Sequence, residues 1–213
     1  MPKVLIADNI SDVVCEIFDT NNIEYEKKVG LSEDELSAEI KGYDGLLIRS
    51  AVTVTKKIIE SSDNLKVIGR PGVGVDNVDL QASSEKNIVV MNTPLGNVQA
   101  TAELTFGIIH SLMRKIHIAN SSMHNKKWEK KKLIGNELLG KNIAIIGFGN
   151  IGKKVADFAK AYGMNIIVVS ETASSGDVDY LNAKVMKFDD MLSEADIITF
   201  HNKLSEKSKY IIN

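Results

Sequence analysis

Short apolar runs alternate with amphipathic segments along the whole chain. In the first half these runs predict strands at Lys3–Ala7, Gly45–Ile48, Lys66–Ile68 and Ile88–Met91. Their apolar residues alternate little with polar ones, which is typical of parallel strands that helices cover on both faces. The alternation of such strands with helices predicts an α/β fold built on a parallel sheet.

Polar capping residues mark two helix starts in this half. Ser32 followed by Glu35 forms a capping box, in which the side chain of each residue satisfies a backbone N–H group of the other. Ser11 opens an earlier helix, whose predicted apolar face carries Val13, Val14, Ile17 and Phe18. These units predict a first domain at residues 1–96.

The apolar pattern changes to a helical period between Asn97 and Ile118, which predicts one long helix that links two domains. The strand pattern then returns, with apolar runs at residues 142–147, 165–170, 183–188 and 196–201. A helix is expected from the first of these runs to about Gly163, and a short helix near Asp189–Ser193. Together they predict a second domain at residues 97–213.

A basic, polar stretch at residues 123–132 interrupts this second domain and predicts a solvated arm within residues 97–140. Trp128 is the single tryptophan of the chain. It either folds onto its own domain or anchors a contact with another subunit, since aromatic residues concentrate in such contacts.

Composition excludes several classes of protein. The chain has 213 residues, of which 44% are hydrophobic and 25% charged, as in ordinary globular domains. The net charge is -2, and no run of Lys or Arg alternates with aromatic residues, which argues against nucleic acid as a partner. Cys15 stands alone and no Cys/His spacing indicates a metal site, so a reducing, cytoplasmic setting is expected. No apolar stretch approaches the ~20 residues of a membrane span.

The most specific single motif is the glycine-rich turn that follows the apolar run at 142–147. Gly147 permits a tight turn, Gly149 allows close approach of a pyrophosphate, and Gly152 allows close packing of the helix that begins there. Backbone N–H groups at such a helix start bind phosphate oxygens. The motif therefore predicts a dinucleotide site.

The next strand after this turn, at residues 165–170, ends in Ser170, where NAD enzymes usually carry Asp or Glu for the ribose hydroxyls. Glu171 follows directly, but neighbouring side chains at a strand end point to opposite faces. A serine tolerates the 2′-phosphate of NADP, yet no arginine stands nearby to bind it and Glu171 would repel it. We therefore expect NAD rather than NADP.

Two polar breaks follow apolar runs in the first domain, where ligands of open parallel sheets bind. Arg49 and Ser50 form the first break, at the end of the strand GLLI, and a guanidinium there suits a phosphate or carboxylate, although a surface ion pair is the alternative. The second is the turn 69–74, GRPGVG, whose backbone N–H groups either bind a carboxylate or form an ordinary Gly-Pro turn.

The chain resembles the D-isomer specific 2-hydroxyacid dehydrogenases, and within them the branch that oxidises 3-phosphoglycerate to 3-phosphohydroxypyruvate in serine synthesis. The resemblance covers the whole chain, in the family's order and spacing. It rests on LLIRSAVTVT, GRPGVGVDNVDL, VMNTPLGNVQATAELTFGI, KWEKKKLIGNELLGK and GFGNIGKKVADFAKAYGM. It implies two doubly wound parallel-sheet domains, a flavodoxin-like substrate domain and an incomplete Rossmann domain that binds NAD.

The same resemblance implies a set of site residues. Arg49 and Ser50 would hold the substrate phosphate, the N–H groups of Val73 and Gly74 its carboxylate, and Asn97 would line the cleft. The cofactor contacts it implies are Val73, Gly147, Gly149, Asn150, Ile151, Gly152, Ser170 and Asn202. It also implies a homodimer or higher homo-oligomer, paired through the linking helix and the arm.

Three departures from the family pattern change the expectations. Ser170 replaces the ribose-binding acid, and Lys203 departs from the HxPLT pattern after the last strand. The family's catalytic Arg, Glu and His would lie beyond Asn213, so no catalytic residue is assigned. We expect the chain alone to be a truncated, inactive and aggregation-prone dehydrogenase. None of the four histidines is assigned as a substitute (His110, His117, His124 and His201).

Two alternatives remain open at this point. A non-catalytic, NAD-binding dimer, similar to corepressors that share this fold, would retain the nucleotide domain for assembly. A glyoxylate or hydroxypyruvate reductase would use the same fold without needing a phosphate-binding arginine at position 49.

Overall fold

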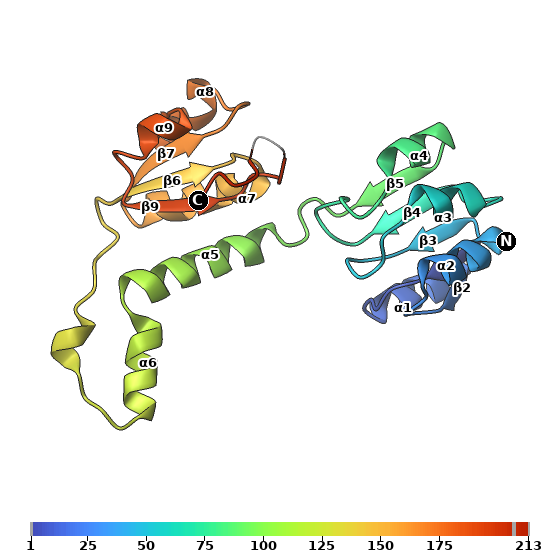
Figure 1. Ribbon diagram of the computed structural model, residues 1–213, viewed down its shortest axis with the longest axis horizontal. Coiled ribbons are helices and arrows are strands. Elements are labelled where there is room, and N and C mark those ends of the chain that lie inside the picture. The colour runs from blue at the N-terminus through green and yellow to red at the C-terminus, as the bar shows by residue number, and fades with distance from the viewer. Residues whose placement is uncertain (1, 206–207, 213) are drawn as a thin grey trace. The chain divides into compact units, whose positions relative to one another are not determined.

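The computed structural model describes residues 2–205 and 208–212. The chain divides into two compact units, Met1–Asn97 and Val98–Asn213. Each unit is an α/β fold around its own parallel sheet (Figure 1). Among the described residues, no helix is long and apolar enough to cross a bilayer.

The first unit has a five-stranded sheet in which all neighbouring strands are parallel. Its strands are β1 (Lys3–Ile6), β2 (Glu24–Lys27), β3 (Gly45–Leu47), β4 (Val67–Arg70) and β5 (Val89–Asn92). The order β2-β1-β3-β4-β5 confirms the expected flavodoxin-like arrangement. The chain reverses its direction of winding between β1 and β3, and open α/β sheets bind ligands beside the carboxyl ends of strands at such a reversal.

The sequence pattern did not reveal β2. Its residues, EYEK, are polar because β2 lies at the edge of the sheet and pairs with β1 alone. Edge strands need fewer apolar residues than central ones, and charged side chains there protect the edge from pairing with other chains.

Three helices of the first unit form one layer. The capping box predicted at Ser32 and Glu35 is confirmed at the start of α2 (Glu33–Glu39), which continues into η1 (Ile40–Gly42) and packs beside α3 (Lys56–Ser61). Beyond α3 lies α4 (Leu80–Glu85). Their buried residues join the core with the strands.

The first helix differs from the prediction. It is α1 (Val13–Thr20), which begins after Asp12 and buries no residue fully. The expected apolar face is largely open, with Val13 54% and Ile17 52% exposed. The reason is its place in the fold, because α1 contacts the edge strand β2 rather than the centre of the sheet.

The second unit has a four-stranded parallel sheet in the order β8-β7-β6-β9. Its strands are β6 (Asn142–Ile146), β7 (Asn165–Val169), β8 (Lys184–Val185) and β9 (Ile197–Phe200). Its helical segments after β6 are α7 (Asn150–Ala161), α8 (Ser175–Val178), η3 (Asp179–Leu181) and α9 (Phe188–Met191). The predicted strand 183–188 is shorter than expected, because Phe188 already begins α9.

The predicted linking helix is broken in two. It forms α5 (Val98–Met113) and α6 (Ile116–His124), and Lys115 between them has a φ of 54°. After the short η2 (Lys130–Leu133) the chain returns to the end of α5, where the N–H of Asn136 donates to the carbonyl of Met113 at 2.8 Å. The returning segment thus satisfies a carbonyl that a continuous helix would have used, which no local pattern revealed.

Glu26 on β2 is held by three side chains, and its pKa should make stability depend on pH. Its carboxylate lies 2.5 Å from Nζ of Lys3 and 2.9 Å from Nζ of Lys28, and the Tyr43 hydroxyl donates to it at 2.7 Å. The hydrogen bond from Lys3, followed by those from Lys28 and Tyr43, lowers the pKa of Glu26 from 4.5 to about 2. A depressed pKa stabilises the fold above the unfolded-state value, and this contribution disappears as pH falls through the folded-state value.

Glu26→Gln should therefore lower the urea midpoint of unfolding at pH 7, and the gap to the wild type should close between pH 4.5 and 2. Glu24→Gln is the matched control, since Glu24 is 3.9 Å from Lys3 and more exposed. A gap for Glu26→Gln that stays constant over this range would contradict the assignment.

Candidate functional site

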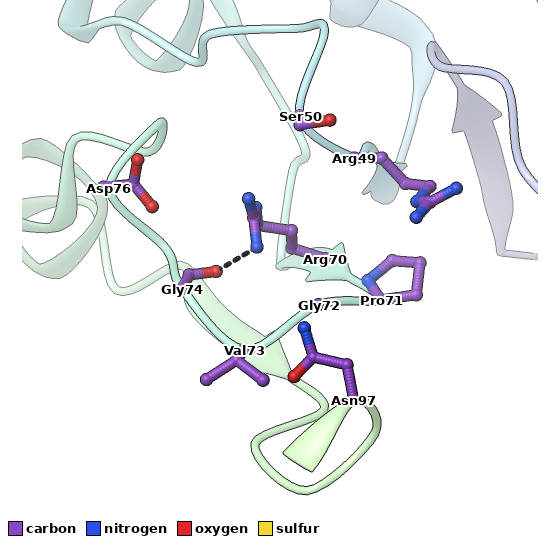
Figure 2. Close-up of a pocket in the computed structure, with 9 residues that line it drawn as sticks. All are labelled: Arg49, Ser50, Arg70, Pro71, Gly72, Val73, Gly74, Asp76 and Asn97. Carbon is purple, nitrogen blue, oxygen red and sulfur yellow. Dashed lines mark hydrogen bonds between the residues drawn. The ribbon is translucent and has the colours of Figure 1, made fainter. Parts of the chain in front are cut away.

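A pocket of about 240 Å³ lies at the carboxyl edge of the first sheet. The segments that follow β3 and β4 form most of it, and the last residue of the unit completes it (Figure 2). It is lined by Arg49, Ser50, Arg70, Pro71, Gly72, Val73, Gly74, Asp76 and Asn97. The five substrate-site residues predicted from the sequence are thus brought together in one place.

Arg49 and Ser50 follow β3 and have exposed side chains. Within residues 2–205 and 208–212, the guanidinium of Arg49 has no hydrogen bond or ion pair. An exposed guanidinium without a partner in the protein is available for an anion, and its planar fork matches phosphate or carboxylate. The ion pair considered as an alternative from the sequence is not formed in this part of the chain.

The backbone of this segment is fixed by Asp8, which lies two residues after the end of β1. Asp8 is 5% exposed, and its Oδ2 accepts hydrogen bonds from the N–H groups of Arg49 and Ala51, both at 3.0 Å. Burial by itself raises the pKa of Asp8, but bonds from backbone N–H groups outweigh it and hold the pKa below its ordinary value. The sequence analysis did not single out Asp8, although a carboxylate directly after a buried strand was a usable signal.

Arg70, the last residue of β4, is a second cation in the pocket that was not assigned as a site residue. Its Nη1 donates to the carbonyl of Gly74 (Figure 2). Its Nε is buried and has no hydrogen-bond partner in the described chain. A Cβ at Gly72 would lie 2.5 Å from Nη1, so glycine at this position leaves room for the guanidinium.

The turn after β4 presents backbone donors to the pocket. The carbonyls of Gly72 and Val73 are occupied, by the N–H of Thr93 at 2.9 Å and Nδ2 of Asn92 at 2.7 Å. The N–H groups of Val73 and Gly74 donate to no acceptor among the described residues. The pocket lining thus includes two free N–H groups and two arginines, a combination suited to an anionic ligand.

The glycine-rich turn of the second unit lies at the carboxyl edge of its sheet. Gly147 has a φ of 93°, and a Cβ there would lie 2.6 Å from the backbone nitrogen of Asn202. A Cβ at Gly152 would lie 2.1 Å from the carbonyl oxygen of Gly147, whereas a Cβ at Gly149 would meet nothing within 4 Å. Two glycines are therefore required by close packing, and the third leaves open space beside the start of α7.

The start of α7 has no side-chain cap, so its first N–H groups, from Asn150 and Ile151 onward, face this open space uncapped. The turn lies between β6 and its neighbours β7 and β9, where the winding of the sheet reverses. Open α/β sheets bind nucleotides at such a reversal. This geometry fits the diphosphate of a dinucleotide.

Ser170 and Asn202 follow β7 and β9, at the same edge of the sheet as this turn. The Oγ of Ser170 accepts from the N–H groups of Thr172 and Ala173, at 3.2 and 3.3 Å, and so shapes its own loop. Asn202 follows His201, and burial lowers the pKa of that histidine. All cofactor residues predicted within residues 147–202 thus lie along one sheet edge, while Val73 belongs to the first unit.

The sequence profile described as D-isomer specific 2-hydroxyacid dehydrogenase, catalytic domain, matches residues 4–196. The D-3-phosphoglycerate dehydrogenase of Archaeoglobus fulgidus is 39% identical over 199 residues, which cover 93% of this chain and 38% of that protein. The human D-3-phosphoglycerate dehydrogenase is 39% identical over 211 residues, or 99% of this chain and 40% of that protein. The chain thus spans about 40% of the length of these curated relatives.

Solved structures share the fold. The TT0316 protein of Thermus thermophilus is 27% identical, with a TM-score of 0.86 over 97% of this chain and 66% of that one. The D-lactate dehydrogenase of Aquifex aeolicus, solved with NAD and lactic acid, has a TM-score of 0.87 at 21% identity over 99% of this chain and 63% of that one. The second likeness bears on the fold alone.

Proposed function

Because the chain belongs to the D-isomer specific 2-hydroxyacid dehydrogenase family of oxidoreductases, we propose that it serves the NAD-dependent oxidation of 3-phosphoglycerate to 3-phosphohydroxypyruvate. The observation that carries the proposal is the pocket of the first unit, which offers two guanidinium groups and two free backbone N–H groups to a ligand. A substrate with an anionic group at each end matches this arrangement. The relatives named D-3-phosphoglycerate dehydrogenase add support.

The first unit would bind the substrate. Arg49 and Ser50 would hold the phosphate, because the guanidinium of Arg49 is exposed and without a partner in the described chain. The N–H groups of Val73 and Gly74 would hold the carboxylate, and Asn97 would line the same pocket. Arg70 would add positive charge beside both groups.

The second unit would bind NAD, which accepts the hydride when bound. The open space beside Gly149 would admit the diphosphate, and the uncapped N–H groups of Asn150 and Ile151 would bind its oxygens. Oxidation also needs a base for the hydroxyl proton. The resemblance assigns that role to family positions that no residue of this sequence matches.

The cofactor preference should change at Ser170. Ser170→Asp should increase the affinity for NAD severalfold, because a carboxylate accepts hydrogen bonds from both ribose hydroxyls. It should lower the affinity for NADP, because the carboxylate repels the 2′-phosphate. Isothermal calorimetry with the two nucleotides measures both effects. Thr172→Asp, in the same loop, controls for the added charge, and equal responses of the two variants would contradict this role of Ser170.

The proposed substrate is tested by titrating the chain with 3-phosphoglycerate and with D-glycerate, which lacks the phosphate. We expect 3-phosphoglycerate to bind at least about tenfold more tightly than D-glycerate. Equal affinities would overturn it in favour of a glyoxylate or hydroxypyruvate reductase. Binding of NAD without affinity for either acid would favour a non-catalytic NAD-binding protein.

A further inference from the structure

The loop that carries Arg49 is held from both sides by residues from other parts of the first unit. We propose that Asp8 is a positioning residue, whose carboxylate fixes the backbone of Arg49 and Ala51 and thereby sets the preference of the pocket for a phosphorylated ligand. This inference rests on the proposed function, since it concerns the same pocket.

The contacts of Asp8 join two strand ends. Oδ2 accepts from the N–H groups of Arg49 and Ala51, each at 3.0 Å, and Oδ1 accepts from the N–H of Asn9 at 2.7 Å. Asp8 follows β1 and Arg49 follows β3, so the carboxylate lies where the winding of the sheet reverses. One buried side chain therefore connects the segments that follow β1 and β3.

Asn77 holds the same segment from the other side. Its Nδ2 donates to the carbonyls of Arg49 and Val52, both at 2.6 Å. The peptide groups on both sides of the Arg49 Cα are thus fixed, one through its N–H and one through its carbonyl. Asp8 and Asn77 therefore largely determine the direction in which the Arg49 side chain leaves the backbone.

The fixed backbone matters because the guanidinium has no support of its own. No described residue bonds to the Arg49 side chain, so its position follows from its backbone and its rotamer. A long side chain on a mobile loop loses conformational entropy when it binds an anion. A loop that is already fixed loses less conformational entropy when the ligand binds. This gain strengthens the contact of Arg49 with the phosphate more than the contacts of the pocket with the rest of the ligand.

A carboxylate fits this role better than an amide. Asn9, Arg49 and Ala51 all donate backbone N–H groups to Asp8, and an ionised carboxylate accepts bonds on both oxygens. Asparagine would keep one acceptor for Arg49 and Ala51 but turn its own NH2 group toward the N–H of Asn9. Asp8→Asn should therefore retain the fold and loosen the loop partly, while Asp8→Ala removes all three bonds.

The test compares the ratio of dissociation constants for D-glycerate and 3-phosphoglycerate, measured by calorimetry on the full chain. A variant that only destabilises the fold lowers both affinities equally, so the ratio reports on positioning. We expect the ratio to fall about tenfold in Asp8→Ala and about threefold in Asp8→Asn. Asp8→Asn keeps the test decisive if Asp8→Ala does not fold.

Asp44→Ala is the matched control. Its carboxylate also accepts a backbone N–H, from Lys3 at 3.0 Å, but lies before β3 at the opposite edge of the sheet. The ratio should keep its wild-type value in this variant. A wild-type preference that persists in both Asp8 variants would overturn this inference alone, and so would an equal fall in Asp44→Ala. Absence of any preference in the wild type would overturn the proposed function, and this inference with it.

Discussion

Replacing Gly152 by alanine is expected to weaken NAD binding strongly and to destabilise the second unit. The added Cβ would lie 2.1 Å from the carbonyl oxygen of Gly147 and 3.4 Å from a methyl group of Ile145. The first neighbour is a backbone atom, so relief requires α7 to move away from the turn. Overpacking of this kind costs about 2 to 4 kcal/mol.

The movement of α7 would also displace the N–H groups of Asn150 and Ile151, which we propose bind the diphosphate. The expected loss of NAD affinity is on the order of 100-fold, equivalent to about 3 kcal/mol. Calorimetry with NAD and thermal unfolding measure the two effects separately. Native affinity for NAD in a folded Gly152→Ala protein would contradict the assignment of this turn.

Gly149→Ala is the control that separates packing from binding. A Cβ at Gly149 meets nothing within 4 Å, and its φ of -79° is accessible to any residue. The free energy of unfolding of this variant should lie within about 0.5 kcal/mol of the wild-type value. It should still lose NAD affinity, roughly tenfold, because the methyl group would occupy space that the diphosphate needs. Loss of stability without loss of affinity would indicate a purely structural glycine.

Arg49→Ala is expected to remove most of the preference for a phosphorylated ligand. Hydrogen bonds from a charged donor contribute about 1.5 to 3 kcal/mol, which corresponds to about a 10- to 100-fold weaker affinity for 3-phosphoglycerate. Binding of D-glycerate should change little, because we propose that its carboxylate binds the N–H groups of Val73 and Gly74. Stability should also be unchanged, since the Arg49 guanidinium contacts no described residue through a hydrogen bond or ion pair.

Arg49→Lys is the matched control for this substitution. Lysine keeps the charge but lacks the planar fork that binds two phosphate oxygens. It should retain part of the preference, between the values for the wild type and Arg49→Ala. If both variants bind 3-phosphoglycerate as the wild type does, the phosphate site lies elsewhere in the pocket.

Features that depend on neighbouring residues were predictable. The capping box needs only Ser32 and Glu35, and the glycine-rich turn needs only six consecutive positions after an apolar strand. The central strands were predicted because both of their faces are covered and they must be apolar throughout. β2 was not predicted, because an edge strand need not be apolar throughout.

The pocket was predicted only in part, for a similar reason. Arg49, Ser50, Val73 and Gly74 were found because they end apolar runs or form a recognisable turn. Asp8 was not, because its role appears only when β1 and β3 lie side by side and its carboxylate meets an N–H group 41 positions away.

The sequence alone determined that this chain is two α/β units and where most of their strands lie, and it predicted a diphosphate site at one turn. These properties follow from apolar periodicity and from glycines within a few positions of one another. Only the tertiary structure decided that the linking helix breaks at Lys115, where the returning Asn136 takes the carbonyl of Met113. It likewise brought Asp8 to the Arg49 loop, because hydrogen bonds between distant segments depend on how the strands are ordered, which local pattern does not encode.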